Sequence, residues 1–373
     1  MDFSQYGGPS KEWLAVEAAL PPVPPGLSII QKRDATNAFR EASSAQAMES
    51  LGNQIELIDV TIPARDGFAL EGRLYWPRTL PKAAGPALYL HLHGGGYLFG
   101  TLASEDSVCS QIALNITAKS LDKGGVVVLN LNYRHTPEYV YPTAWHDTQD
   151  TLAWIHEVGV PTFGIDPARI IVGGVSAGAH LAASMVLEQH LGRLDDLAGK
   201  KLPPIAGQVL MIPTLVSISC YAPQLARMIS PDVSSTVENK DAPLLSLATM
   251  QFFTDLLMRD APEGFAVDPF DTKLNPGNAT VDQVKGLPPS VFGICGLDPL
   301  RDEGLLFAEL LTKAGVPVDA HIFKGVPHGF RRHGDKISVS KNWDEVMEGG
   351  ILYALSNPVP AKELTVQVHS EAV

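Results

Sequence analysis

The sequence is poor in several features that define whole classes of protein. Its 373 residues contain three cysteines, Cys109, Cys220 and Cys295, whose odd number and wide spacing fit neither a disulfide framework nor a cysteine metal site. It has no run of 18 apolar residues, so we expect no membrane span. Lysine and arginine total 28 against 41 acidic residues. The resulting net charge of −13 argues against binding to nucleic acid or to an anionic membrane.

The first residues also lack the basic start and apolar centre of a signal peptide. We therefore expect a cytoplasmic protein with reduced thiols. Hydrophobic residues make up 45% of the chain, which is enough for a large core.

Short apolar runs alternate with segments that have helical character. Strands are expected at residues 55–62, 69–75, 87–93, 125–131, 169–172, 205–212, 290–295 and 316–323. Helices are expected at residues 31–51, 147–156, 179–187, 300–314 and 343–355. This alternation predicts an α/β fold with a doubly wound, mostly parallel sheet of eight strands. The stretch of about residues 213–286 shows no clear strand and predicts an inserted helical cap.

Ser176 lies between Gly174 and Gly178, where an expected strand is followed by an expected helix. A serine between two glycines on such a turn has the exposed position that a nucleophile needs. The glycines are required because a Cβ at either position would crowd the serine or the strand behind it. The alternative is an ordinary glycine-rich turn, because this short motif also occurs by chance.

Three consecutive glycines, Gly94–Gly96, follow His93 at the end of another expected strand. Backbone N–H groups without side chains above them suit an oxyanion hole. His91 and His93 have the spacing of zinc ligands on a strand, but no third ligand pattern accompanies them. A phosphate-binding loop is the other alternative, but no Lys-Ser or Lys-Thr pair follows the glycines.

An aspartate and a histidine follow the last two expected strands. Asp298 comes directly after the strand at 290–295, and His328 follows the strand at 316–323. The chain order Ser, Asp, His is that of a hydrolase triad. Asp302 is the alternative carboxylate, although a place in the first turn of a helix would explain it through the helix dipole. The alternative for His328 is an ordinary core or surface histidine.

These motifs, taken in order, resemble those of the hormone-sensitive-lipase-like (type IV) esterases in the α/β-hydrolase superfamily. The matching segments are His93–Tyr97, Asn132–Glu138, Pro142–Ala144 with Asp147, Gly174–Gly178, Asp298–Asp302 and His328–Phe330. The resemblance extends over about residues 55–355. Two positions depart from the family pattern. Val175 stands where the family usually has Asp or Thr, and Ala179 stands where a further glycine is common.

The resemblance implies a role for each of these residues. Ser176, Asp298 and His328 would form the catalytic triad, and Gly95, Gly96 and Ala177 would supply the oxyanion hole. Tyr97, Phe99 and Val175 are predicted to contact the substrate. Tyr133, Arg134 and Glu138 are expected to form an internal brace of hydrogen bonds or ion pairs.

The same resemblance predicts the organisation of the chain. Residues 1–54 would form an N-terminal cap or lid, residues 55–357 the α/β-hydrolase catalytic domain with its cap insertion at about 213–286, and residues 358–373 a tail.

The predicted function is a serine hydrolase that cleaves a small or medium-sized carboxylic ester through an acyl-enzyme. One alternative is a lactonase, acyltransferase or cyclase that uses the same triad on a natural-product intermediate. Another is a receptor that binds a ligand without turnover. We expect no cofactor or metal, a small ester or lactone as substrate, and no nucleic-acid or membrane partner. The oligomeric state is left open, with a homodimer as one alternative.

Overall fold

The computed structural model describes residues 1–21, 26–194, 201–262 and 264–371. The chain divides into two compact units. One unit runs from Pro24 to Gln208, and the other combines Met1–Val23 with Val209–Val373.

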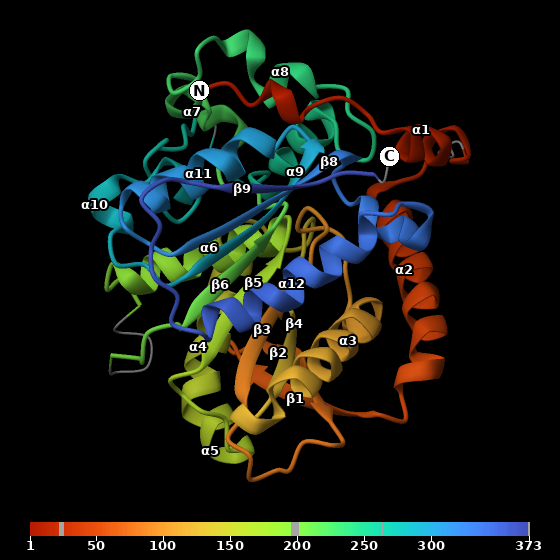
Figure 1. Cartoon of the computed structure of the whole chain (residues 1–373), viewed down its shortest axis with the longest axis vertical. Helices are drawn as coiled ribbons and strands as arrows, with labels where there is room; N and C mark the ends of the chain where they lie inside the picture. The colour runs from red at the N-terminus through yellow and green to blue at the C-terminus, as the bar shows by residue number, and fades with distance from the viewer. Residues whose placement is uncertain (22–25, 195–200, 263, 372–373) are drawn as a thin grey trace. The chain divides into compact units, whose positions relative to one another are not determined.

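Five strands form the sheet of the unit Pro24–Gln208, in the order β1-β2-β4-β3-β5 (Figure 1). Their bounds are β1 Ile55–Pro63, β2 Ala69–Pro77, β3 Ala87–Leu92, β4 Val126–Asn132 and β5 Ile170–Val175. β2 pairs antiparallel with β1 and β4, whereas β3 pairs parallel with β4 and β5. Every residue of β3 is buried, as expected for a strand covered on both faces.

The helices of this unit are α2 Ile29–Leu51, α3 Leu102–Ser120, α4 Thr143–Trp154, α5 Val160–Phe163 and α6 Ala177–His190. Capping boxes start two of them. Ser28 and Gln31 cap α2, and Thr101 and Ser104 cap α3, so backbone N–H groups at these helix starts have partners.

Three parallel strands, β7 Ser290–Leu297, β8 Val318–Pro327 and β9 Val366–His369, pair side by side in the other unit. Its helices are α1 Lys11–Ala18, α7 Ala222–Leu225, α8 Ser235–Glu238, α9 Leu247–Leu257, α10 Val281–Val284, α11 Arg301–Lys313 and α12 Ser340–Ala354. The boundary between the units falls within β6, Gly207–Met211.

The described residues form nine strands, so the expected number of eight is wrong. The additional strand is β9, in the segment 358–373 that we expected to be a tail. It pairs with β8 from Ala320↔Val366 to Phe323↔His369, and its His369 ring stacks on those of His321 and Phe323. The described residues of the stretch 213–286 contain helices and no strand, as predicted. That this stretch and residues 1–54 act as a cap stays a prediction.

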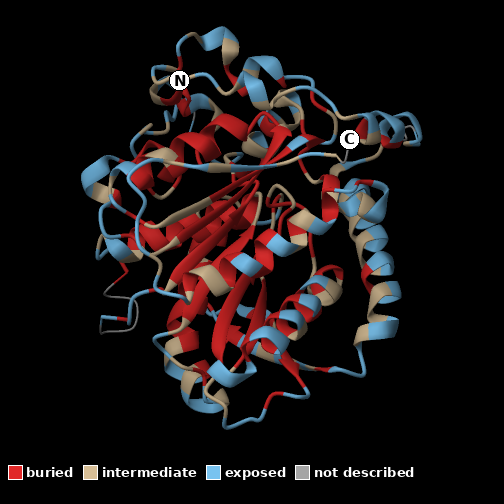
Figure 2. Cartoon of the chain, viewed as in Figure 1, coloured by how far each residue is buried: buried red, intermediate tan, exposed pale blue. Residues whose placement is uncertain are grey.

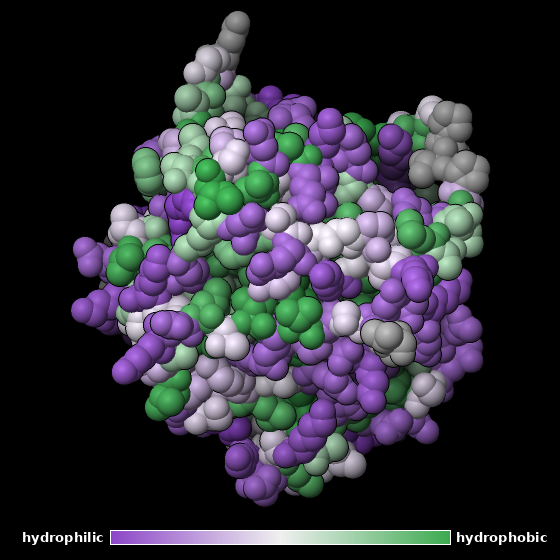
Figure 3. Space-filling view, turned by 45° about the horizontal axis from the view of Figure 1, so that its top comes forward, coloured by the Kyte–Doolittle hydropathy of each residue, from purple (hydrophilic) through white to green (hydrophobic). Residues whose placement is uncertain are grey.

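Buried residues follow the strands and the inner faces of the helices (Figure 2). On the face shown in Figure 3, hydrophobic residues form small groups separated by hydrophilic ones. Within the described ranges, no helix combines the length and hydrophobicity that crossing a membrane requires.

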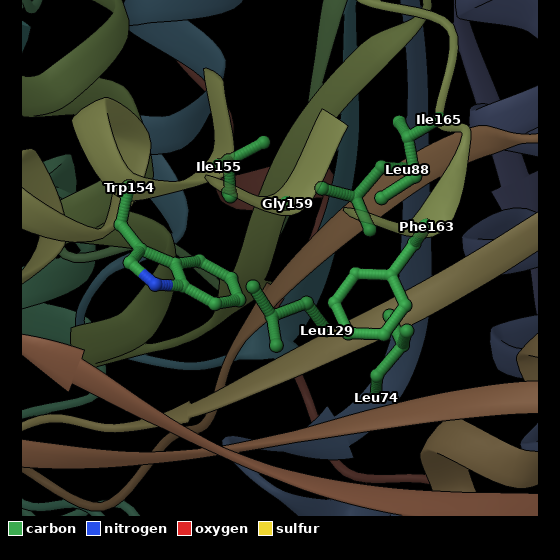
Figure 4. A pocket seen from close by; sticks show the side chains of 8 residues that line it. All are labelled: Leu74, Leu88, Leu129, Trp154, Ile155, Gly159, Phe163 and Ile165. Atoms are coloured by element: carbon green, nitrogen blue, oxygen red, sulfur yellow. The ribbon is translucent and has the colours of Figure 1, made fainter. Parts of the chain in front are cut away.

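A fully apolar pocket lies in the unit Pro24–Gln208, and its lining is drawn in Figure 4. Leu74, Leu88 and Leu129 come from three neighbouring strands, and Trp154 and Phe163 face them from the helical side. This pocket is part of the hydrophobic core, because its lining side chains are hydrocarbon apart from the single indole N–H of Trp154.

Candidate active site

Ser176 occupies a sharp turn between β5 and α6. Its backbone has φ 56° and ψ −117°, a conformation that a residue with a Cβ rarely adopts. A Cβ on Gly174 or on Gly178 would collide with the carbonyl oxygen of Leu92. Both glycines are therefore needed for the turn to lie against the end of β3. Ser176 itself is half-buried and precedes the positive end of a 14-residue helix.

The three-glycine loop continues from β3 and packs against the same turn. A Cβ on Gly94 would lie 2.8 Å from the carbonyl oxygen of Val175, and one on Gly95 would collide with the backbone of Phe99. Gly95 and Gly96 have φ values of 143° and 59°, which favour glycine. The loop is closed by bonds from the N–H groups of Leu98 and Phe99 to the carbonyl of Gly95, at 3.1 and 3.0 Å. These two bonds fix the carbonyl of Gly95, and with it the amide between Gly95 and Gly96.

The histidines before the glycines are part of the packing. The His93 ring stacks on Tyr133 with 4.4 Å between centroids, and the Tyr133 hydroxyl donates to the His93 carbonyl at 2.8 Å. Burial lowers the pKa of His93 to about 4, which keeps the ring neutral. His91 Nε2 lies 3.2 Å from a carboxylate oxygen of Glu105. Among the described residues, no three His, Cys, Asp or Glu side chains are grouped in a way that could hold a metal ion.

Asp298 and His328 meet in the unit that contains β7 and β8. Asp298 follows β7, and His328 follows β8, so the loops after two adjacent parallel strands carry the pair. His328 Nδ1 lies 2.7 Å from Asp298 Oδ2. The other carboxylate oxygen, Oδ1, accepts the backbone N–H of Leu300 at 2.9 Å. Asp298 is 1% exposed and His328 9%, so solvent screens this contact weakly.

Asp302, the alternative carboxylate, has different partners. It lies in the first turn of α11, where Oδ2 accepts the N–H of Ser235 at 2.7 Å and Oδ1 accepts from Arg301 at 2.8 Å. Asp302 therefore fixes α8 to the start of α11, while Asp298 holds the histidine.

The expected internal brace after β4 is present at Tyr133 and Arg134, which are buried, whereas Glu138 is exposed. Arg134 Nη2 donates to Asp147 Oδ1 at 2.6 Å, and the Arg134 backbone N–H donates to the other oxygen of Asp147 at 2.9 Å. A further bond at 2.6 Å joins Arg134 to Asp66. Glu138 accepts two bonds from Arg33, at 2.6 and 3.0 Å. These contacts fix the segment after β4 that carries Tyr133.

The residues predicted to contact substrate differ in burial. Tyr97 is buried, its ring is stacked on Trp145, and its hydroxyl lies 2.6 Å from His180 Nδ1. Phe99 and Val175 are half-buried. Contact of these three side chains with a substrate stays a prediction.

Two buried glutamates near the motifs were not identified from the sequence. Glu105 accepts a hydrogen bond from Arg40 at 2.7 Å. Burial alone would raise the pKa of Glu105. The hydrogen bond with His91 and the positive charge of Arg40 outweigh burial, so the pKa of Glu105 is lowered. Burial raises the pKa of Glu303 to about 8, although Glu303 accepts the N–H of Leu215. Glu303 could have been singled out from the sequence because it directly follows the motif Asp298–Asp302. Nothing in the sequence connects Glu105 with Arg40, which lies 65 positions earlier.

Comparison with known proteins decides the family. A family model described as alpha/beta hydrolase fold matches residues 89–332. The chain belongs to the α/β-hydrolase family. The esterase LipI of Mycobacterium tuberculosis is 31% identical over 302 residues, which cover 80% of this chain and 82% of LipI. The ethyl acetate hydrolase of Pseudomonas putida is 31% identical over 313 residues, covering 83% and 86% of the two chains.

Solved structures of this hydrolase family show the same fold. Vibralactone cyclase is 26% identical with a TM-score of 0.79, and the match covers 95% of this chain and 97% of the cyclase. A bacterial heroin esterase is 28% identical with a TM-score of 0.74, covering 95% and 100%. The predicted resemblance to hormone-sensitive-lipase-like esterases and the predicted α/β-hydrolase fold are both confirmed.

Proposed function

We propose that this hydrolase cleaves carboxylic esters, with Ser176 as nucleophile, His328 as general base and Asp298 as the residue that orients the histidine. The observation that carries the proposal is the 2.7 Å contact between His328 Nδ1 and the buried Asp298 carboxylate. This contact places a proton on Nδ1 and makes Nε2 the nitrogen that takes the proton of the serine. The strained turn at Ser176 supports its role as nucleophile.

The reaction follows from these groups. Ser176 Oγ attacks the acyl carbon while His328 takes its proton, and the carbonyl oxygen becomes an oxyanion. The N–H groups of Gly95, Gly96 and Ala177 are proposed to stabilise that oxyanion. The protonated histidine then donates its proton to the leaving alcohol, which gives an acyl-enzyme. A water molecule, activated by the same histidine, releases the carboxylic acid and restores Ser176.

Small and medium-sized esters are the proposed substrates. The names of the two relatives, an esterase and an ethyl acetate hydrolase, support this class. Cytoplasmic location stays a prediction from the sequence, and a homodimer stays one alternative for the oligomeric state.

The test compares wild-type protein with Ser176→Ala on p-nitrophenyl acetate, butyrate and palmitate. Ser184→Ala is the matched control, because Ser184 is a buried serine on the same helix as the turn. We expect the wild type and Ser184→Ala to hydrolyse the short esters and to be labelled by a fluorophosphonate, and Ser176→Ala to do neither. Equal turnover by Ser176→Ala and wild type would rule out Ser176 as the nucleophile.

A second candidate is the formation or opening of a lactone by the same residues. The similarity to vibralactone cyclase, at a TM-score of 0.79 and 26% identity, favours it. Lactone formation differs from hydrolysis in what attacks the acyl-enzyme, which is a hydroxyl of the substrate instead of water; lactone opening uses water, as ester hydrolysis does. Product analysis in H₂¹⁸O separates them, because ¹⁸O enters the acid formed by hydrolysis and is absent from a lactone formed by cyclisation.

A further inference from the structure

Helix α2 is hydrogen-bonded to the three-glycine loop and to the start of α3. Asn37 Oδ1 accepts the backbone N–H of Gly100 at 2.9 Å. Glu41 accepts the hydroxyl of Thr101, the N-cap of α3, at 2.7 Å. Ser44 accepts the N–H of Ser107 at 3.0 Å. Positions 37, 41 and 44 follow one face of the helix, so α2 contacts this region over two turns.

Arg40 lies on the same face and reaches the glycine loop itself. Its Nη1 donates to the carbonyl oxygen of Gly94 at 3.2 Å, while Nη2 donates to Glu105 at 2.7 Å. Glu105 is buried and also contacts Ser104 and His91. The guanidinium is therefore held by a carboxylate that is itself fixed by α3 and β3.

The bond to Gly94 acts on the amide between Gly94 and Gly95. In a trans peptide the C=O and the N–H lie in one plane and point in opposite directions. A donor on the Gly94 carbonyl thus sets the direction of the Gly95 N–H, one of the proposed oxyanion donors. It also draws electron density from that amide, which strengthens the N–H as a donor.

Such a restraint matters most in a run of glycines. The amide between Gly94 and Gly95 turns through ψ of Gly94 and φ of Gly95, and neither residue has a Cβ to oppose that rotation. In the part of the chain that the structure describes, the other polar contact of the Gly94 carbonyl is with His93 Nδ1 at 3.3 Å, from the adjacent residue. Arg40 is the restraint that comes from outside the loop.

We propose that Arg40 is a positioning residue for the oxyanion hole, holding the Gly94–Gly95 amide with its N–H turned toward the developing oxyanion. This inference rests on the proposed function, because it assumes that the glycine loop binds the oxyanion. It assigns to α2 a share in the catalytic rate.

The test replaces Arg40 with Met, which keeps the aliphatic length and removes every donor. Active sites are counted with a fluorophosphonate, and kcat per labelled site, KM and Tm are measured with p-nitrophenyl acetate. A trifluoromethyl ketone, whose adduct carries an oxyanion, is the transition-state analogue. We expect kcat to fall by about 10-fold to 100-fold with KM nearly unchanged, and the affinity for the ketone to fall by a similar factor.

Arg33→Met is the matched control on the same helix, because the Arg33 guanidinium pairs with Glu138. We expect its kcat and ketone affinity to equal those of the wild type. Arg40→Lys keeps a charged donor and should recover part of the lost kcat. If Arg40→Met fails to fold, Arg40→Gln is measured in the same way, since its shorter side chain does not reach Gly94.

Different results would contradict the positioning role of Arg40 and the proposed esterase function. An unchanged kcat per labelled site and an unchanged ketone affinity in Arg40→Met would overturn the positioning role. A fall in the number of labelled sites and in Tm, with kcat per site preserved, would also overturn it and assign Arg40 to stability alone. If Ser176→Ala retained wild-type turnover, the proposed function itself would fail.

Discussion

Replacing Asp298 with Asn tests the proposed base through the tautomer of His328. The backbone N–H of Leu300 donates to Asp298 Oδ1, so the oxygen of the new amide is required at that position. The amide NH₂ then takes the place of Oδ2, which lies 2.7 Å from His328 Nδ1. An NH₂ group there needs an acceptor, so the ring must carry its proton on Nε2. That nitrogen can then no longer take the proton of Ser176.

The expected loss is large although the two side chains have nearly the same shape. An asparagine in place of a triad aspartate lowers kcat by about 10⁴-fold, which corresponds to about 5 kcal/mol of activation free energy. The variant should fold, because the Leu300 N–H keeps its acceptor. The loss should therefore appear in kcat at nearly constant Tm.

The assay is steady-state hydrolysis of p-nitrophenyl acetate at pH 7 to 8, with Tm from thermal unfolding. Asp302→Asn is the matched control, because Asp302 is a buried carboxylate whose partners are Ser235 and Arg301 instead of His328. We expect it to lower Tm and to leave kcat within a few-fold of the wild type. An Asp298→Asn enzyme with more than one tenth of wild-type kcat would refute the argument.

Three further predictions concern stability, measured by urea unfolding. Glu303→Gln should raise the free energy of unfolding above pH 8 by about 1 kcal/mol or more. The folded carboxyl, with a pKa of about 8 against an ordinary 4.5, keeps a proton that the unfolded chain releases, so wild-type stability falls as pH rises between these values. Arg134→Met should cost about 3 to 5 kcal/mol, because it leaves the buried Asp147 without its cation. Gly178→Ala should cost about 1 to 3 kcal/mol or more, because the new Cβ meets the backbone at Leu92.

Each of these has an outcome that contradicts it. The same pH dependence in Glu303→Gln and wild type would show that this carboxyl ionises normally in the folded protein. A change below 1 kcal/mol in Arg134→Met would show that Asp147 finds another partner. Wild-type stability in Gly178→Ala would show that the turn relaxes away from the end of β3.

Most strands were predictable because their apolar runs are bounded by turn residues. The expected strand at 55–62 corresponds to β1 Ile55–Pro63, and the expected strand at 87–93 corresponds to β3 Ala87–Leu92. The helix expected at 31–51 became α2 Ile29–Leu51. Hydrophobicity suffices for the two strands, which are apolar runs, whereas α2 was predictable from its Ala, Glu and Gln residues, although a single residue of it, Ser44, is buried.

Helix α3 and strand β9 are among the elements that the sequence analysis did not predict, and the reasons differ. Helix α3, Leu102–Ser120, begins at a capping box of Thr101 and Ser104, and this signal was present but unused. β9 has four residues with a weak alternation of Val366 and Val368, and β8 supplies its backbone partners. A strand so short is defined by its neighbour more than by its own sequence.

The residues of the candidate site also differ in whether the sequence could predict them. Ser176, Asp298 and His328 could be proposed because each follows a strand in a recognisable motif. Arg40 could not, because its contact with Gly94 spans 54 positions and depends on how α2 packs. The preference for Asp298 over Asp302 was a matter of loop position in the sequence, and the contact with His328 gives it a geometric basis.

The strand β9 also bears on how copies of this protein could associate. Its backbone occupies the outer hydrogen-bonding groups of β8 from Ala320 to Phe323. β9 is itself an edge of the sheet, but it offers a second molecule four residues to pair with, whereas an uncovered β8 would offer an edge of ten residues. Removing residues 365–373 would expose that row of amides and carbonyls, and the shortened protein should self-associate at concentrations where the full chain does not.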